Sequence, residues 1–285
     1  MQLELERRDP NRPINWFVHL PDQPENDALK FDYSPFREPS AVLTLRIFHS
    51  FRFVICFPAF MCGRYRRTTQ EEELARLYHI PIPKQTDLPI SYNIVPSQKV
   101  LTIRFNPEIQ QRSLDALQWG LIPYWAKDPK ISYRTINARA ETVDKAPSYR
   151  QAFKKRRCLI PADGFYEWRK TAKPKLPFAI AMKDGRPFTF AGLWENWKDP
   201  GSGEWLRTCT IITGEPNELL AQIHPRMPVI LPEQHHAAWL GETDDGNLKT
   251  LLVPYPPDQM RMWEISPRVN SPKNDDPSLI ELAKR

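Results

Sequence analysis

The residues with the clearest chemical potential begin at Cys62, which follows Met61 and precedes Gly63. If translation starts at Met61, the small second residue favours removal of the initiator methionine and leaves Cys62 at the chain terminus. Its α-amine and thiol have reference pKa values of about 8 and about 8.5, so both are nucleophiles near neutrality. A terminal aminothiol captures an aldehyde as a thiazolidine ring, which an internal cysteine cannot do because its nitrogen is an amide. The alternative is a cysteine that packs as a small buried hydrophobe.

Two motifs further along the chain combine groups suited to anion binding or proton transfer. Asn137 and Arg139 are two residues apart, so on an extended segment both side chains point the same way. The arginine fork matches a phosphate. Glu167 lies between aromatic residues, where desolvation raises the pKa of a carboxyl group and suits it to acid–base catalysis. The alternatives are a polar strand face and an edge-strand glutamate that faces water.

A third motif follows a strand and a short helix. Thr213 ends an apolar run, and His224 comes directly after a helix expected over residues 216–223. A histidine in this position can donate or accept a proton near pH 7. Arg226, two residues further on, can hold a phosphate. The alternative for His224 is a helix cap.

Basic and aromatic residues also interleave in a way that suits nucleic acid. Further arginines follow Arg64, and the segment from Trp119 to Trp125 is rich in aromatic residues. Aromatic side chains beside a cationic groove are typical of proteins that bind single-stranded nucleic acid. The formal net charge of +6 and the pI of about 9.1 are compatible with a polyanionic partner, although mild basicity is common among soluble proteins.

The composition argues against a metal centre, a disulfide framework and a membrane anchor. The 4 cysteines show no C-x-x-C spacing, and the 6 histidines show no H-x-x-x-H spacing. So few cysteines are typical of a reducing, cytosolic setting. The most apolar stretch, residues 41–60, contains Arg46, His49 and Arg52, whereas a membrane-spanning helix tolerates few charges. We therefore expect no metal, no organic cofactor and no transmembrane segment.

Local patterns after residue 61 predict short strands with irregularly inserted helices. A capping box at residues 69–72 starts one helix, Gly241 ends another, and Asp184-Gly185 is typical of a β-hairpin turn. We expect strands at residues 100–105, 157–162, 165–168, 177–182, 187–193 and 206–213. Further helices are expected at residues 216–223 and 232–240. The absence of a βαβ rhythm predicts an α+β fold with mainly antiparallel strands.

Residues 1–60 differ from the rest of the chain. They hold proline-broken stretches and a run of aromatic and basic residues, without lasting helical or strand periodicity. We expect a non-native or disordered N-terminal extension, either an unstructured tail or upstream sequence translated from a wrongly assigned start codon. Residues 61–285 would then form a single domain that starts at its true initiator.

Eight segments carry a resemblance to a known family, in order and with family-like spacing. They are MCGRY at Met61, SYNIVPSQ at Ser91, LQWGLIPYWA at Leu117, INARAET at Ile136, CLIPADGFYEW at Cys158, IIT at Ile211, IHPRMPVIL at Ile223 and SPRVNSPKNDDPSLIE at Ser266. Over residues 61–282 the chain resembles the SRAP family, the SOS response-associated peptidases or abasic-site processing proteins. The resemblance implies a single α+β domain of mainly antiparallel, barrel-like β-sheet with short inserted helices.

The resemblance also implies a function. SRAP proteins bind single-stranded DNA that contains an abasic site, whose ring-opened sugar exposes an aldehyde. The terminal cysteine, here Cys62, forms a thiazolidine crosslink that shields the lesion. Asn137 is implied to contact the lesion and the cysteine, and Glu167 to handle protons on the amine and during removal of the preceding residue. Thr213 and His224 complete the implied active site, where His224 assists sugar ring opening and reversal of the crosslink.

The implied DNA contacts lie around these groups. Arg64, Arg139 and Arg226 match phosphate contacts, and Trp125 matches the segment that lines the DNA channel. The implied partner is single-stranded DNA with abasic sites, without a membrane or a cofactor. We expect a cytoplasmic monomer, associated with the nucleoid in a prokaryote, with autocatalytic peptidase and lyase activities alongside crosslinking.

Two alternatives remain open. Cys62 could be the nucleophile of a cysteine peptidase that acts on other proteins, with His224 or Glu167 as base. A non-covalent single-strand binder would use Arg64, Arg139 and the tryptophans alone. Crosslinking has one requirement that the two alternatives do not have. Residues 1–60 must be absent or removed, because a peptide bond before Cys62 leaves it no free amine.

Overall fold

The structure, a computed structural model, describes residues 62–81, 86–169, 175–244 and 246–283, together with the backbone of four short strands near the N-terminus. The chain divides into two units, Met1–Ala59 and Phe60–Arg285. The expectation of an N-terminal extension over residues 1–60 otherwise lies outside the described residues. In the first unit two strand pairs occur, β1 with β2 and β3 with β4, whose bounds are Gln2–Glu4, Phe17–His19, Leu43–Arg46 and Arg52–Ile55.

The larger sheet of the second unit contains a closed ring of strands. Its members in chain order are β7 (Lys99–Asn106), β8 (Gln111–Trp119), β9 (Asn137–Arg139), β10 (Arg157–Ala162), β13 (Phe188–Lys198), β14 (Trp205–Gly214), β15 (Met227–Pro228) and β16 (Ile230–Leu231). The pairing order is β15-β14-β8-β7-β10-β13-β16, and β14 also pairs with β13. Pairing therefore runs from β14 through β8, β7, β10 and β13 back to β14, as in a barrel.

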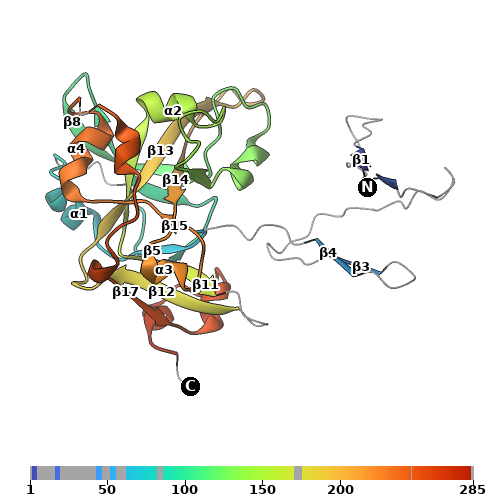
Figure 1. Cartoon of the computed structure of the whole chain (residues 1–285). Coiled ribbons are helices and arrows are strands. Elements are labelled where there is room, and N and C mark those ends of the chain that lie inside the picture. The colour runs from blue at the N-terminus through green and yellow to red at the C-terminus, as the bar shows by residue number, and fades with distance from the viewer. Residues whose placement is uncertain are drawn as a thin grey trace. The chain divides into compact units, whose positions relative to one another are not determined.

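The second sheet lies in the lower part of the domain in Figure 1. Its strand order is β17-β12-β11-β5-β6. The bounds are Tyr65–Arg67 for β5, Ser91–Ile94 for β6, Gly164–Arg169 for β11, Leu176–Met182 for β12 and Met260–Glu264 for β17. Because β11 has a neighbour on each side, its backbone is paired along both edges, and its first four residues are buried.

The two sheets share one apolar core, and the larger sheet faces a second core on its other side. Side chains alternate along β10, as the period of a strand requires. Cys158 and Ile160 join a buried cluster with Phe165 of the second sheet. Leu159 joins a different cluster with Leu74 of the first helix. Both faces of β10 are therefore buried, which explains its continuous apolar sequence.

The helices are short and cover the sheets irregularly. The α-helices are α1 (Glu71–Leu77), α2 (Arg150–Lys155), α3 (Glu218–Ala221) and α4 (His236–Leu240). The 3-10 helices are η1 (Pro129–Arg134), η2 (Glu233–His235), η3 (Leu248–Leu251), η4 (Pro257–Gln259), η5 (Pro267–Asn270) and η6 (Pro277–Ile280). Gly241 closes α4 with φ of 84°, as the sequence predicts. These elements confirm the α+β class and the barrel-like, mainly antiparallel sheet. No helix in the described ranges is long and apolar enough to cross a membrane.

Two local predictions are wrong, and each has a physical reason. The residues around Asp184-Gly185 do not close a hairpin, because β12 belongs to the smaller sheet and β13 to the larger one. The turn instead carries the chain from one sheet to the other. The capping box at residues 69–72 is also absent. Gln70 is the N-cap of α1, and the hydroxyl of Thr69 donates to Asp163 Oδ1 at 2.5 Å.

The helix before His224 is shorter than predicted. The sequence indicates a helix over residues 216–223, whereas α3 spans Glu218–Ala221. Asn217 caps it, because its side-chain oxygen accepts a hydrogen bond from the backbone N–H of Leu220 at 3.0 Å. The backbone N–H of His224 still donates to the Leu220 carbonyl at 2.9 Å, so His224 is held to the end of the helix.

Gly120 follows β8 at the point where β8 pairs with β14, so a substitution there tests how tightly this junction is packed. Its φ is 124°, its N–H donates to the Cys209 carbonyl at 2.8 Å, and an added Cβ would lie 2.8 Å from the Ser132 carbonyl oxygen. We expect Gly120→Ala to lower the free energy of unfolding by about 2 to 4 kcal/mol, from backbone strain plus overlap. Gly203→Ala is the control, because Gly203 also has a positive φ but open space around it. Urea denaturation measures both variants, and equal losses would contradict a steric role for Ser132.

Candidate active site

A single carboxylate oxygen contacts both potential nucleophiles of Cys62. The backbone N–H of Cys62 donates to Glu167 Oε1 at 2.9 Å, and its thiol donates to the same oxygen at 2.8 Å. Both side chains are 3% exposed. The structure thus brings together two residues that are 105 positions apart, and one proton acceptor faces nitrogen and sulfur at once.

The antiparallel pairing of β5 with β11 creates this contact. Tyr65 lies opposite Phe165, and the backbone N–H of Tyr166 donates to the Arg64 carbonyl at 3.0 Å. Continuing this register towards the start of β5 places Gly63 opposite Glu167, so Cys62 lies one residue from the position that faces Glu167. Since Glu167 is on a central strand and buried, the alternative of an edge-strand glutamate that faces water does not hold.

Burial sets the proton affinity of both groups. It raises the pKa of the Cys62 thiol well above its ordinary value, with a further rise from Glu167 and a smaller opposing effect from the positive charge of Arg226. Burial also raises the pKa of the Glu167 carboxyl group, as the sequence predicts, opposed first by the charge of His224 and then by the hydrogen bonds from Cys62. A carboxyl group whose pKa is raised in this way is suited to taking up and returning a proton.

Parallel pairing of β9 with β14 adds three more of the predicted residues. Asn137 lies opposite Ile211, and Arg139 lies opposite Thr213. Ala138 between them is fully buried, so Asn137 and Arg139 share the other face of the strand, as expected from their spacing. Thr213 is fully buried, and its hydroxyl donates to the Ala138 carbonyl at 3.5 Å.

Arg226 reaches the same strand end from the segment after α3. Its Nη2 donates to the Thr213 carbonyl at 2.5 Å, and its Nε lies 3.5 Å from the Thr213 hydroxyl oxygen. Its two terminal nitrogens donate to the two carboxylate oxygens of Glu141 at 2.8 and 2.9 Å. Because its charge lowers the pKa of the Cys62 thiol, Arg226 belongs to the electrostatic environment of Cys62.

His224 is buried beside these groups, and its ring is held through one nitrogen. Nδ1 lies 3.0 Å from the carbonyl oxygen and 3.3 Å from the backbone nitrogen of Arg226. The charge of His224 lowers the pKa of Glu167, so the imidazole acts on the carboxylate that contacts Cys62. Cys62, Glu167, His224 and Arg226 are therefore electrostatically coupled, and Thr213 is hydrogen-bonded to Arg226.

Arg64 and Trp125 are placed differently from the other predicted residues. The guanidinium group of Arg64 donates to Asn93 Oδ1 at 2.9 Å, to the Val269 carbonyl, and to the Asn270 carbonyl at 2.9 Å. It thereby fastens the strand after Cys62 to the C-terminal segment. Trp125 is 48% exposed, and its indole N–H donates to the Pro147 carbonyl at 3.4 Å. Its ring is open to solvent on the segment between β8 and η1.

The model of a known family matches this chain over the residues that build the site. Residues 61–272 match the family described as SOS response associated peptidase (SRAP). The chain belongs to the SRAP family. It is 47% identical over 226 residues to the abasic site processing protein YoqW of Bacillus subtilis (strain 168), covering 78% of this chain and 99% of YoqW. The abasic site processing protein HMCES of Xenopus tropicalis is 32% identical, covering 60% of this chain and 57% of HMCES.

Solved structures share the fold of this chain. A protein from Bacteroides thetaiotaomicron has a TM-score of 0.69 and 28% identity, covering 78% of this chain and 100% of that chain. A protein from Bordetella bronchiseptica has a TM-score of 0.62 and 27% identity, covering 72% of this chain and 100% of that chain. The fold implied by the sequence resemblance is confirmed by these neighbours.

Glu141 is a residue of this SRAP site that sequence reasoning missed. It follows Arg139 by two positions in the motif INARAE but lies in the turn after β9, where strand alternation no longer applies. Its contact with Arg226 joins the end of β9 to the segment after α3. Tyr149 was also missed, and its hydroxyl donates to the Asn137 carbonyl at 3.0 Å.

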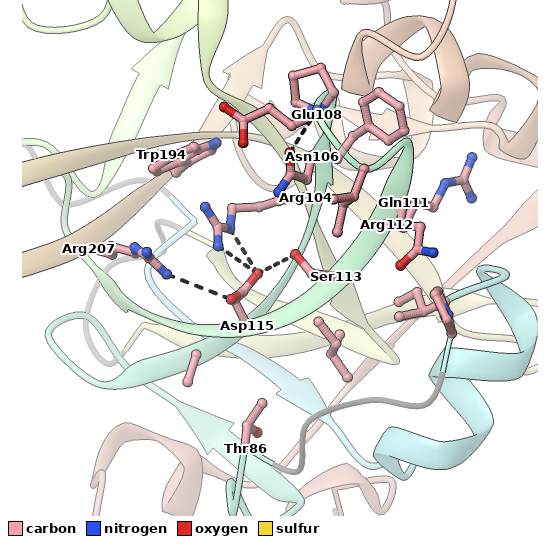
Figure 2. Close-up of a pocket in the computed structure, with 17 residues that line it drawn as sticks. Thr86, Arg104, Asn106, Glu108, Gln111, Arg112, Ser113, Asp115, Trp194 and Arg207 are labelled. Atoms are coloured by element: carbon pink, nitrogen blue, oxygen red, sulfur yellow. Dashed lines mark hydrogen bonds and ion pairs between the residues drawn. The ribbon is translucent and has the colours of Figure 1, made fainter.

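Two cavities of the SRAP domain lie away from these residues. The one in Figure 2, with a volume of about 760 Å³, is lined by residues that include Arg104, Asp115, Trp194 and Arg207. Another of about 740 Å³ is lined by residues that include His236. Neither includes a residue predicted for the site. In the part of the chain that the structure describes, no group of three or more His, Cys, Asp or Glu residues is placed to hold a metal.

The raised pKa of Glu167 predicts how the stability of a glutamine variant depends on pH. Because the folded-state pKa lies above the unfolded value, the stability from protonated Glu167 is present at acid pH and lost as pH rises from about 4.3 through the folded-state pKa. Glutamine has no such loss. We expect Glu167→Gln to gain stability relative to the wild type across that window, at up to about 1.4 kcal/mol per pH unit.

Urea denaturation at a series of pH values measures this difference. Glu204→Gln is the control, because Glu204 is exposed and should give a nearly constant difference. A difference for Glu167→Gln that stays flat or falls as pH rises would show that the carboxyl group is not desolvated in the folded protein.

Proposed function

We propose that this chain processes abasic sites in single-stranded DNA by forming a covalent crosslink through Cys62. The supporting observation is that Glu167 Oε1 contacts both the nitrogen and the sulfur of Cys62. A thiazolidine needs these two atoms to add to the same carbon, so one acceptor that faces both of them suits this reaction. Membership of the SRAP family and the names of the relatives support the choice of an abasic site as substrate.

The proposed reaction has two bond-forming steps. The neutral amine of terminal Cys62 adds to the aldehyde carbon of the ring-opened sugar, and the resulting carbinolamine loses water to give an imine. The sulfur then adds to the imine carbon while the thiol proton is transferred to the nitrogen, which closes the ring. One water is released overall and nothing is oxidised or reduced. Glu167 Oε1 lies where it can move the protons of both steps.

The remaining site residues have roles in binding and ring opening. Asn137 contacts the sugar, and buried His224 assists opening of the sugar ring and reversal of the crosslink. Thr213 holds Arg226 through its carbonyl oxygen. Arg139 and Arg226 contact phosphates.

The DNA contacts further from Cys62 follow from exposure. Trp125 presents an exposed ring for base stacking. Arg64 contributes positive charge beside the strand while it anchors the C-terminal segment. The protein is proposed to act as a cytoplasmic monomer, and reversal of the crosslink could be accompanied by lyase activity.

Removal of the residues before Cys62 is part of the proposed function. The backbone N–H of Cys62 donates a hydrogen bond to Glu167 Oε1. Once that carboxyl group is protonated, it lies where it can supply the proton that the nitrogen takes when water hydrolyses the Met61–Cys62 bond. Cys62 has φ of 46°, a left-handed conformation that costs about 1 to 2 kcal/mol. Hydrolysis removes this strain, which favours a chain that begins at Cys62. This peptidase activity is proposed for the chain's own N-terminal segment, because the Glu167 contact is made to the nitrogen of that bond.

The first test replaces the sulfur. We expect Cys62→Ser to form no denaturant-resistant adduct with a single-stranded oligonucleotide that carries a natural abasic site, because a hydroxyl does not close the ring as a thiol does. Cys209→Ala is the control, because Cys209 is a fully buried thiol in the core and should keep the crosslink. Denaturing electrophoresis measures the adduct. A wild-type protein that binds this DNA only in a salt-sensitive way would favour a non-covalent single-strand binder.

The second test concerns the N-terminus. We expect protein expressed from Met61 to crosslink rapidly, and protein expressed from Met1 to crosslink only to the extent that residues 1–61 have been removed. Intact-mass spectrometry before and after incubation with DNA identifies the first residue of each adduct. An adduct whose mass includes residues 1–61 would overturn the role of the Cys62 amine.

A further inference from the structure

The guanidinium group of Arg226 has an anionic partner in the fold. Glu141 accepts from its two terminal nitrogens in a bidentate arrangement, at 2.8 and 2.9 Å. A phosphate is bound by arginine through the same fork of parallel N–H donors. The carboxylate of Glu141 therefore occupies the positions that a DNA phosphate would take on Arg226.

The side chain of Arg226 is held more firmly than that of Glu141. The Arg226 side chain is 16% exposed and is also anchored on the Thr213 carbonyl, so it keeps its place when the carboxylate leaves. The Glu141 side chain is 46% exposed and projects from a turn, so it can rotate into solvent. Arginine is thus the fixed partner and glutamate the displaceable one.

The backbone of Glu141 is fixed independently of this ion pair. Lys249 Nζ contacts the Glu141 carbonyl oxygen at 3.2 Å and the Asp144 carboxylate at 3.0 Å. The N–H of Thr142 donates to the Arg139 carbonyl at 3.1 Å, which closes the turn. Loss of the Glu141 carboxylate should therefore leave the turn in place, and only the neutralisation of Arg226 should change.

We propose that Glu141 is a positioning residue that occupies the phosphate fork of Arg226 and is exchanged for a DNA phosphate on binding. The inference rests on the proposed DNA-processing function and extends it to the free protein. In the wild type, the displaced carboxylate stays beside the bound phosphate and partly offsets the charge of Arg226, so fewer condensed counterions are released than with an uncharged neighbour. Glu141 thereby lowers both the affinity for DNA and its dependence on salt.

The test replaces the carboxylate with its isosteric amide. For Glu141→Gln in the full chain, we expect up to about fivefold tighter non-covalent binding, since a partly exposed ion pair no longer competes. The dependence of log K on log salt should steepen by up to about 0.7, the value for full neutralisation of one phosphate on a single strand. The probe is a single-stranded oligonucleotide with a tetrahydrofuran abasic analogue, which has no aldehyde. Fluorescence anisotropy at several salt concentrations measures both quantities.

The control is Asp144→Asn, which removes the same charge from the same turn but takes it from Lys249 instead of Arg226. We expect Asp144→Asn to change the salt slope by much less than Glu141→Gln. Equal effects of the two variants would reduce Glu141 to a general surface charge and overturn the proposal. Weaker binding by Glu141→Gln would also overturn it, because the ion pair would then persist in the complex.

A structure of the wild-type protein with the same oligonucleotide provides a second measurement that does not depend on a variant. A phosphate should lie on the Arg226 fork, and the Glu141 carboxylate should lie outside hydrogen-bonding distance of it. A complex in which Glu141 still holds both terminal nitrogens would refute the exchange. Since the analogue cannot crosslink, these results are independent of the adduct test, where failure with natural abasic DNA would count against the proposed chemistry alone.

Discussion

The contact of Glu167 Oε1 with both the nitrogen and the sulfur of Cys62 is the interaction on which the rest of the site depends. For this contact to form, the carboxyl group of Glu167 must be buried while its Oε1 remains available to Cys62. The smaller sheet achieves this by placing Glu167 on a central strand, with Cys62 at the start of the neighbouring strand segment. Burial then raises the pKa values of both groups, and the charges of His224 and Arg226 partly oppose these rises.

The larger sheet supplies the groups that surround this contact. Parallel pairing of β9 with β14 carries Asn137 and Arg139 to the strand end where Thr213 lies. Thr213 then holds Arg226, whose backbone in turn holds the ring of His224. The candidate site therefore draws its residues from two sheets that share an apolar core, and no single element contains all of them.

Local sequence patterns predicted much of the fold, because strand periodicity and terminal glycines act over a few residues. The strand at β10 was predicted at its observed bounds, and Gly241 marked the end of α4. The hairpin at Asp184-Gly185 was wrong because a turn motif does not specify which sheet receives the next strand. The capping box failed because the Asp163 carboxylate competes for Thr69, accepting from both its N–H and its hydroxyl, and that contact spans 94 residues.

The candidate residues were singled out by their chemistry and spacing, and the family resemblance supplied their implied roles, but their contacts were not visible in the sequence. Nothing near Glu167 indicates that its partner is Cys62, because register is a property of the assembled sheet. The pairing of Glu141 with Arg226 was missed for a related reason: Glu141 follows β9 and Arg226 precedes β15, and these strands meet only through β14. Arg64 was assigned to DNA alone, whereas it also binds the Val269 carbonyl.

That contact of Arg64 has a consequence for biosynthesis. The segment beside Cys62 is among the first parts of the domain to leave the ribosome, yet it is held by the carbonyl groups of Val269 and Asn270, which are among the last. A nascent chain that has not yet reached η5 lacks the groups that fix this segment against β6. The segment that contains Cys62 is thus synthesised early but fixed in place late in folding.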